Sequence, residues 1–361
     1  MACAGEGSGS PAGRRGMIRT ALFAPWPEQA RSYPGAVSIA VLVGFYALAN
    51  LPVIIATAAH VIATGEALPP PLMMFSLLLA QFVIWGVLTG VWAGVMERRG
   101  PASLGLEGRG VPGRLLLGAG LALALIGFTA MAGAGISAIT GDSLTAVGAA
   151  DAPGAAQDEG AQAAGFRPLS AGFLAMLGFI GLVFLIQGAV EELVFRGWLM
   201  SALAARWGVR AGVLVSSLIF MIFHVHVFAS GLAFGSLALA TIGLMGLVFA
   251  LASLLRGSIW EAAGAHGVFN ALAVTLPALA LYVTRPDLSG DEVVQSVFSA
   301  ATGLAGEAAG IPPQVYAQLI VMAAAAAWLY AMLAGRRLND RGGDPHDHDD
   351  GHDGPQRQNA P

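Results

Sequence analysis

The sequence predicts an all-α fold, a polytopic transmembrane helix bundle of about eight spans, and three observations lead to it. Hydrophobic residues make up 56% of the 361-residue chain, charged residues only 11%, and the mean hydropathy is +0.70. A soluble globular domain carries about 25% charged residues. The apolar residues form long uninterrupted runs, and such runs satisfy their backbone hydrogen bonds in a bilayer only as helices. The chain is therefore predicted to be a multi-pass integral membrane protein.

Eight apolar runs are long enough to cross the hydrocarbon layer, which takes about 20 helical residues. Each run ends at proline, glycine or a charged residue, so each is expected to form a separate helix. The runs lie near residues 36–63, 72–96, 115–139, 171–195, 211–229, 232–255, 258–283 and 314–334.

The charges between these runs predict the orientation of the chain. Arginine-rich segments alternate with acidic or neutral segments, and cytoplasmic loops are those enriched in basic residues. Both termini are therefore predicted to be cytoplasmic, in the cell (inner) membrane, and the even number of spans agrees with this. The basic segments contain Arg14, Arg15, Arg19, Arg31, Arg98, Arg99, Arg109, Arg114, Arg196, Arg206, Arg210, Arg256, Arg336, Arg337 and Arg341. The acidic loops contain Asp142, Asp151, Asp158, Glu159, Asp287, Asp291, Glu292 and Glu307, against Arg167 and Arg285.

Composition divides the chain into five parts. A cytoplasmic N-terminal tail is expected at 1–35, and membrane spans at 36–170 that include a mobile Ala/Gly-rich loop at 140–170. Residues 171–283 carry the polar motifs discussed below, and 284–334 form a loop and the last span. The tail at 335–361 is rich in Asp and His and is expected to be disordered. The single cysteine, Cys3, excludes an internal disulfide and a cysteine metal site.

Two adjacent glutamates, Glu191 and Glu192, lie inside an apolar stretch in which no charge occurs from Ala171 to Ala189. A carboxylate in hydrocarbon is costly and persists only when partners or water compensate for it, so the pair indicates a functional site. Arg196 follows Glu192 by four residues, which predicts an ion pair within the helix. Gln187 lies one turn before Glu191, on the same face.

Two further motifs supply histidines and an amide from other spans. Phe220 precedes His224 by four residues, and His266 precedes Asn270 by four, so each pair is expected to share one helix face. Counted from the predicted cytoplasmic ends of their helices, Glu191, His224 and His266 all lie about 13–20 Å deep. Comparable depth on three helices predicts that these groups meet in one buried site.

Such a set of residues can hydrolyse peptide bonds in either of two ways. In the first, Glu191 takes a proton from water with the help of His224, and His266 with Asn270 donates hydrogen bonds to the developing oxyanion. In the second, Glu191, His224 and His266 bind one divalent metal ion, Zn²⁺, and leave a coordination position for water. The cofactor is thus either absent or a single zinc ion.

The motifs E-E-x-x-x-R, F-x-x-x-H and H-x-x-x-N, in this order over residues 171–283, resemble the CPBP family. This family comprises CAAX prenyl proteases of the Rce1 type and bacterial Abi proteins, and it is commonly described as a metalloprotease family. The resemblance implies an intramembrane protease in which Glu191 is the catalytic carboxylate and His224 its partner. It further implies that His266 and Asn270 stabilise the transition state. Glu192, Arg196 and Phe220 would support the site.

Two other classes of function use the same buried polar groups. They could form the proton or substrate pathway of a transporter, or hold together a non-catalytic scaffold or immunity protein. Motifs of other intramembrane proteases, such as H-E-x-x-H or paired G-x-G-D, do not occur. The partners expected are a peptide or protein substrate at the membrane and the lipid bilayer, with no nucleic acid. The sequence carries no signal for an oligomeric state.

Overall fold

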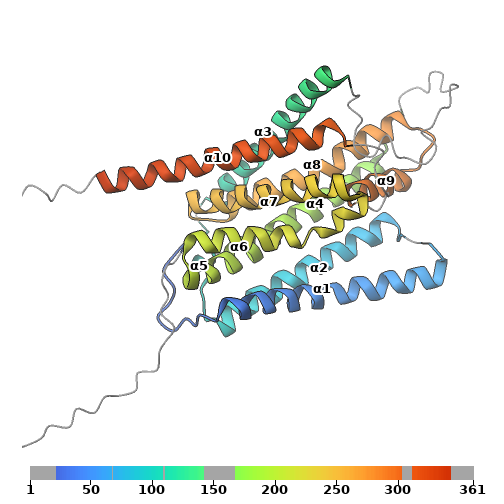
Figure 1. Cartoon of the computed structure of the whole chain (residues 1–361). Coiled ribbons are helices and arrows are strands. Elements are labelled where there is room, and N and C mark those ends of the chain that lie inside the picture. The colour runs from blue at the N-terminus through green and yellow to red at the C-terminus, as the bar shows by residue number, and fades with distance from the viewer. Residues whose placement is uncertain (1–21, 67, 109, 142–166, 303–310, 343–361) are drawn as a thin grey trace, which may run out of the picture.

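A computed structural model of the chain describes residues 22–66, 68–108, 110–141, 167–302 and 311–342, which form a bundle of helices (Figure 1). The described residues contain no strand, and the predicted all-α polytopic bundle is confirmed. Most of the loop expected at 140–170, and much of the tail expected at 335–361, lie outside the described residues. The longer helices are α1 (Gly35–Thr64), α2 (Pro71–Val91), α3 (Val111–Thr140), α4 (Ala171–Glu192), α6 (Val209–Ile222), α7 (Leu232–Arg256), α8 (Trp260–Thr284), α9 (Gly290–Thr302) and α10 (Pro313–Gly342). The short elements are η1 (Trp92–Met96), η2 (Pro101–Leu104), η3 (Leu193–Met200), α5 (Ser201–Trp207) and η4 (Val225–Ser230).

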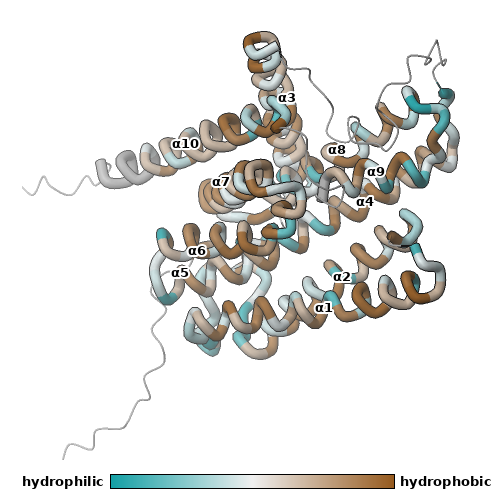
Figure 2. Tube along the Cα trace, turned by 45° about the vertical axis from the view of Figure 1, so that its right-hand side comes forward, coloured by the Kyte–Doolittle hydropathy of each residue, from teal (hydrophilic) through white to brown (hydrophobic). Residues whose placement is uncertain are grey.

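Seven of the eight predicted spans correspond to helices long and apolar enough to cross a membrane. The fourth span is the longest, because α4, the π-helix η3 and α5 run on as 37 residues from Ala171 to Trp207. Hydrophobic residues cover the lengths of the helices, and hydrophilic residues gather mainly near their ends (Figure 2). This distribution is the one that a lipid environment favours.

The span expected at 211–229 differs from the prediction. Its helix, α6, has 14 residues and covers about 21 Å, which is less than the bilayer core. It ends at Ile222, and His224, with φ −108° and ψ 15°, is the residue immediately before the 3₁₀ segment η4. In a continuing helix the backbone N–H of residue 224 would bond to the carbonyl of Phe220. Here the His224 side chain takes that carbonyl through Nδ1 at 2.8 Å, and its backbone N–H bonds to Met221 instead.

The helices α4 and α8 pack against each other at the centre of the bundle, with α1 and α2 to one side and α3 and α10 to the other (Figure 1). Glycines permit the close approach of α4 and α8. A Cβ added at Gly188 would lie 2.5 Å from the backbone nitrogen of Gly267, and one at Gly267 would lie 2.9 Å from the Cα of Leu185. Small residues at a helix crossing let two backbones meet, as is common in membranes.

The region before the last span, for which the sequence predicts a loop, contains α9. The side chains of Val293, Val294 and Val297 are buried on one face of this helix. Its start is a capping box, in which Glu292 accepts from the backbone of Ser289 at 2.7 Å and Ser289 accepts from the backbone of Glu292 at 3.2 Å. The Ser-x-x-Glu spacing was the sequence signal for this helix.

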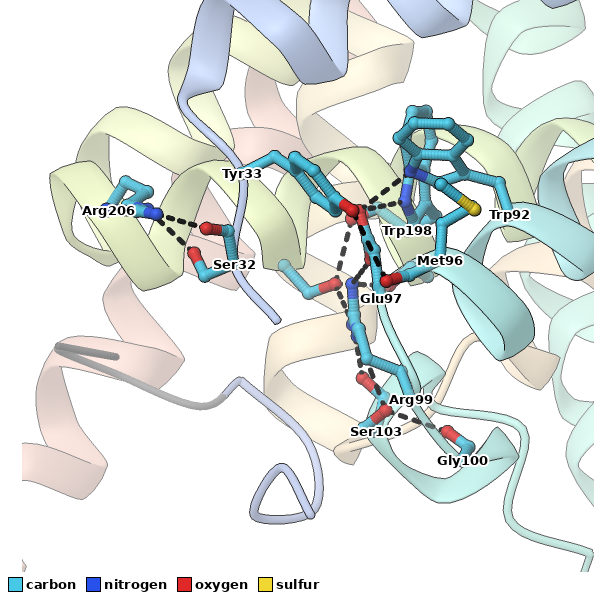
Figure 3. A network of polar contacts seen from close by, with 12 residues as sticks. Ser32, Tyr33, Trp92, Met96, Glu97, Arg99, Gly100, Ser103, Trp198 and Arg206 are labelled. Carbon is cyan, nitrogen blue, oxygen red and sulfur yellow. Dashed lines mark hydrogen bonds and ion pairs between the residues drawn. The ribbon is translucent and has the colours of Figure 1, made fainter. Parts of the chain in front are cut away.

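A buried polar network joins the segment between η1 and η2 to η3 and to the first residue of α5 (Figure 3). Arg99, counted in the sequence as a loop charge, is buried and pairs with Glu97 at 3.1 Å. Glu97 also accepts from the indole nitrogens of Trp92 at 3.1 Å and Trp198 at 3.0 Å, and Arg99 donates to Ser201 at 2.6 Å. We call Glu97, Arg99, Trp198 and Ser201 the Glu97 clamp, because they tie the end of the second span to the end of the fourth.

Candidate active site

The two glutamates of the fourth span are buried at the junction between an α-helix and a π-helix. Glu191 and Glu192 are the last residues of α4, and η3 begins at Leu193. Their exposed fractions are 4% and 0%, so both carboxyl groups are removed from solvent and lipid. A π-helical turn inside a longer helix is rare and frequently marks a functional site.

His266 of α8 bridges the two glutamates. Its Nδ1 donates to Oε1 of Glu192 at 2.8 Å, and its Nε2 lies 3.4 Å from Oε2 of Glu191. The glycine contact between α4 and α8 explains this proximity, because Gly267 adjoins His266 and Gly188 lies one turn before the glutamates. The ring of His266 is 1% exposed, which holds both contacts in a medium of low dielectric constant.

The predicted ion pair between Glu192 and Arg196 is present. Nη1 of Arg196 lies 2.8 Å from Oε1 of Glu192, and both side chains are fully buried. Nη2 of Arg196 donates to the carbonyl of Gly246 at 3.0 Å, and the guanidinium lies over the ring of Phe220 with 4.4 Å to the centroid. Phe220 is therefore packed against the site, as expected, and its contact is with the arginine that neutralises Glu192.

Asn270 is connected to the glutamates through a residue that had no role in the sequence analysis. Its Nδ2 donates to Oε1 of Gln187 at 3.2 Å, and Nε2 of Gln187 donates to Oε1 of Glu191 at 2.9 Å. The spacing of four between Gln187 and Glu191 was the sequence signal for this contact. Gln187 thus orients the carboxyl group of Glu191 and leaves its Oε2 free of protein hydrogen bonds among the described residues.

His224 faces the same cavity as Glu191 but makes its hydrogen bond elsewhere. Because the carbonyl of Phe220 can only accept, Nδ1 of His224 carries the proton of their 2.8 Å hydrogen bond. In the neutral ring Nε2 then has a lone pair. The expectation that His224 and Phe220 share a helical face was wrong, because the helix ends before His224. The two rings nevertheless touch, with 4.7 Å between centroids.

A cavity of about 550 Å³ joins these groups. Glu191, His224, His266 and Asn270, which the sequence placed on three separate spans, all line it. Glu192 and Arg196 lie behind this wall and do not line the cavity. Phe220 does not line it either, so the structure separates the predicted set into four residues that a substrate could reach and three that it could not.

The metal-binding alternative receives no support from this arrangement. Within the part of the chain that the structure describes, no three His, Cys, Asp or Glu side chains form a group that could hold a metal ion. His266 directs one ring nitrogen to each glutamate, so neither nitrogen points away from a carboxylate. The set Glu191, His224 and His266 does not fit a zinc site in this geometry.

Comparison with known proteins gives one family. Residues 173–272 match the family model described as "Type II CAAX prenyl endopeptidase Rce1-like". No curated protein and no solved structure matches the chain. The matched range contains all the site residues described above, from Gln187 to Asn270. The match confirms the resemblance seen in the sequence and supports intramembrane endopeptidase activity in general.

Proposed function

Since residues 173–272 form an Rce1-like domain, we propose that this chain is an intramembrane endopeptidase whose water is activated by Glu191 and His224. The observation that carries the proposal is the convergence of Glu191, His224, His266 and Asn270 on one cavity. Buried polar groups without a functional role would be expected to hydrogen-bond to one another and leave no cavity between them. Here Oε2 of Glu191, in a side chain that lines the cavity, is buried without a hydrogen bond among the described residues, and its nearest charged neighbour is Nε2 of His266 at 3.4 Å.

Glu191 is suited to accept a proton from water. Gln187 holds its Oε1, so Oε2 is the oxygen left to take a proton. Nε2 of His224, which carries the lone pair of the neutral ring, is a second acceptor in the same cavity. A water oxygen that loses its proton to this pair attacks the carbonyl carbon of the peptide bond. General base catalysis of this kind contributes about 10²–10⁴-fold in rate.

His266 and Asn270 are suited to stabilise the oxyanion that this attack creates. Glu192 binds Nδ1 of His266, so Nε2, which lies 3.4 Å from Oε2 of Glu191, is the ring nitrogen beside the proposed base. As a donor to the oxyanion, Nε2 needs a ring that carries protons on both nitrogens, because Nδ1 already donates to Glu192. The amide of Asn270 has a second N–H beyond the one donated to Gln187. Removing one such donor typically costs about 10²–10³ in kcat.

The tetrahedral intermediate then breaks the bond between carbon and nitrogen. The proton taken from water returns to the leaving amine, and the products are a peptide with a new carboxyl end and one with a new amino end. Glu192 and Arg196 take no part in these transfers. They position His266, because Glu192 fixes its ring and Arg196 neutralises Glu192.

The variant Glu191→Gln tests the mechanism. It keeps the shape of the side chain and the contact with Gln187 but cannot accept the proton. We expect new amino termini to appear among membrane proteins of cells that express the native chain, and their yield to fall at least 100-fold with Glu191→Gln. His224→Gln should give a loss of similar direction. Quantitative labelling of amino termini in isolated membranes measures both.

Two controls separate catalysis from folding. Glu107→Gln makes the same chemical change at an exposed position far from the site, and it should leave the yield of new termini unchanged. The midpoint of thermal unfolding in detergent should agree between Glu191→Gln and the native chain. Equal yields from both proteins would contradict the proposal. A variant that unfolds as it loses activity would instead indicate the non-catalytic scaffold.

A further inference from the structure

Arg98 is the only described residue other than glycine whose backbone lies in the left-handed region, with φ 55°. The seven other described residues with φ in this region are all glycines, which adopt it without steric strain. The turn has a structural cause, because the side chains of Glu97 and Arg99 on either side both enter the Glu97 clamp (Figure 3). Backbone strain of this kind accompanies functional positions, so the exposed guanidinium of Arg98 is a candidate for a binding role.

Arg98 lines a hollow of about 490 Å³ with four residues from the segment before α1: Glu28, Gln29, Ala30 and Arg31. The backbone N–H of Arg31 donates to the carbonyl of Glu97 at 2.8 Å, so the two arginines belong to backbone segments that are hydrogen-bonded to each other. Both arginines are exposed, and neither guanidinium is among those that form ion pairs in the described part of the chain. The hollow therefore holds two positive charges against the carboxylate of Glu28.

The hollow lies at the level where the helices leave the hydrocarbon layer. The second span ends at Met96, two residues before Arg98, and α1 begins four residues after Arg31. Tyr33 and Trp92 contact each other nearby, with 5.4 Å between ring centroids, and residues of these types gather at membrane interfaces. The phosphate groups of lipids lie at this level, and a guanidinium can bind two phosphate oxygens at once.

The helix surface that leads to Arg98 is apolar. Val87, Val91 and Val95 follow one another at intervals of four along the second span, with exposed fractions of 58%, 55% and 66%. This spacing places them in one row on the helix surface. Acyl chains can lie along this row while a phosphate contacts the arginines, whereas a free phosphate ion makes no use of it. The basic hollow and the apolar row together therefore favour a lipid over a free anion.

We propose that Arg31 and Arg98 bind the phosphate of an anionic phospholipid, with its acyl chains beside Val91 and Val95. The site is separate from the candidate active site, and the inference does not depend on the proposed peptidase function. A bound lipid would fasten the segment before α1 to the end of the second span, next to the Glu97 clamp. Each arginine near the phosphate is expected to strengthen binding about 5-fold.

Titration of lipid into the purified full chain, in a nonionic detergent, tests the site. The midpoint of thermal unfolding should rise with dioleoyl phosphatidylglycerol and respond much less to dioleoyl phosphatidylcholine. The apparent affinity for phosphatidylglycerol should fall about 5-fold in Arg31→Gln and in Arg98→Gly. Arg210→Gln removes an exposed arginine that does not line the hollow, so it is the matched control and should bind as the native chain does.

Two variants should have effects that a loss of folding could not produce. Arg98→Gly relieves the backbone strain, so its unfolding midpoint without lipid should be no lower than that of the native chain, even though its affinity for phosphatidylglycerol falls. Glu28→Gln removes the carboxylate from the hollow and should raise that affinity.

The same titrations contain the results that would overturn the inference. Native affinity in both Arg31→Gln and Arg98→Gly would do so, as would an equal loss of affinity in Arg210→Gln. Equal stabilisation by phosphatidylcholine, or by inorganic phosphate at the same concentration, would also overturn it, because the site would then not require an anionic lipid.

Discussion

The contact between Gly188 and Gly267 gives the sharpest test of how the site is assembled. In Gly188→Ala, the new Cβ would lie 2.5 Å from the backbone nitrogen of Gly267 and 2.7 Å from its Cα. Non-bonded carbon atoms are stable at about 3.5–4.0 Å, so α4 and α8 must separate by about 1 Å. Backbone atoms, unlike the end of a flexible side chain, cannot turn aside.

This separation breaks the contact on which His266 depends. Nδ1 of His266 and Oε1 of Glu192 are 2.8 Å apart, and a further 1 Å takes them beyond the roughly 3.2 Å limit of a good hydrogen bond. A displacement of about 1 Å in a catalytic group can cost about 100-fold in rate. Overpacking of this kind also destabilises by about 1–3 kcal/mol. We therefore expect Gly188→Ala to fold, to unfold at a lower detergent or denaturant midpoint, and to lose about 99% of its cleavage.

Gly181→Ala is the matched control, because a Cβ at Gly181 on the same helix meets no atom within 4 Å. The yield of new amino termini in isolated membranes and the unfolding midpoint are measured for both variants. If Gly188→Ala retained the activity and stability of Gly181→Ala, the idea that the glycine crossing places His266 against the glutamates would be refuted.

Two further predictions concern the buried ion pairs. Arg196→Met removes the guanidinium that pairs with Glu192 and should lower the free energy of unfolding by about 3–5 kcal/mol. The double variant with Glu192→Gln should lose less stability than the sum of the two single losses. A double-mutant cycle of denaturation measures this, and additive losses would contradict the pairing. Arg99 is a cation at neutral pH, because burial lowers its pKa only to about 10. Glu97→Gln removes its carboxylate partner, so this variant should unfold at a midpoint in detergent well below that of the exposed control Glu107→Gln.

Much of the architecture could be read from the sequence, because in a bilayer the length of an apolar run and its flanking charges determine most of it. Relations within one helix were equally accessible: the spacing of four correctly predicted the pair formed by Glu192 and Arg196. The same rule, applied to Phe220 and His224, wrongly predicted that one continuous helix contains both residues. The His224 side chain bonds to the Phe220 carbonyl, which the backbone N–H of residue 224 would use in a continuing helix. Hydrophobic periodicity in the sequence does not reveal this competition between side chain and backbone.

Contacts between side chains of different helices could not be predicted from the sequence. Comparable depth predicted that three spans contribute to one site, but the rotation of each helix about its axis determines which atoms meet. That rotation depends on where two backbones can touch, and the chain has 49 glycines with nothing to distinguish Gly188 and Gly267 among them. The burial of Arg99 was hidden for a similar reason: its partners Glu97 and Ser201 are separated by one whole span and most of the next.

The π-helix η3 connects the buried glutamates of the candidate site to the Glu97 clamp. Glu191 and Glu192 immediately precede it, and Trp198, which donates to Glu97, lies within it. Seven of its eight residues are buried, so this segment cannot turn without breaking contacts at both ends. To act as the proposed base, Glu191 must be held to within about 0.5 Å and 10–20° of its working geometry. The Glu97 clamp, although remote from the cavity, therefore holds the rotation of the fourth span and with it the direction in which Glu191 faces.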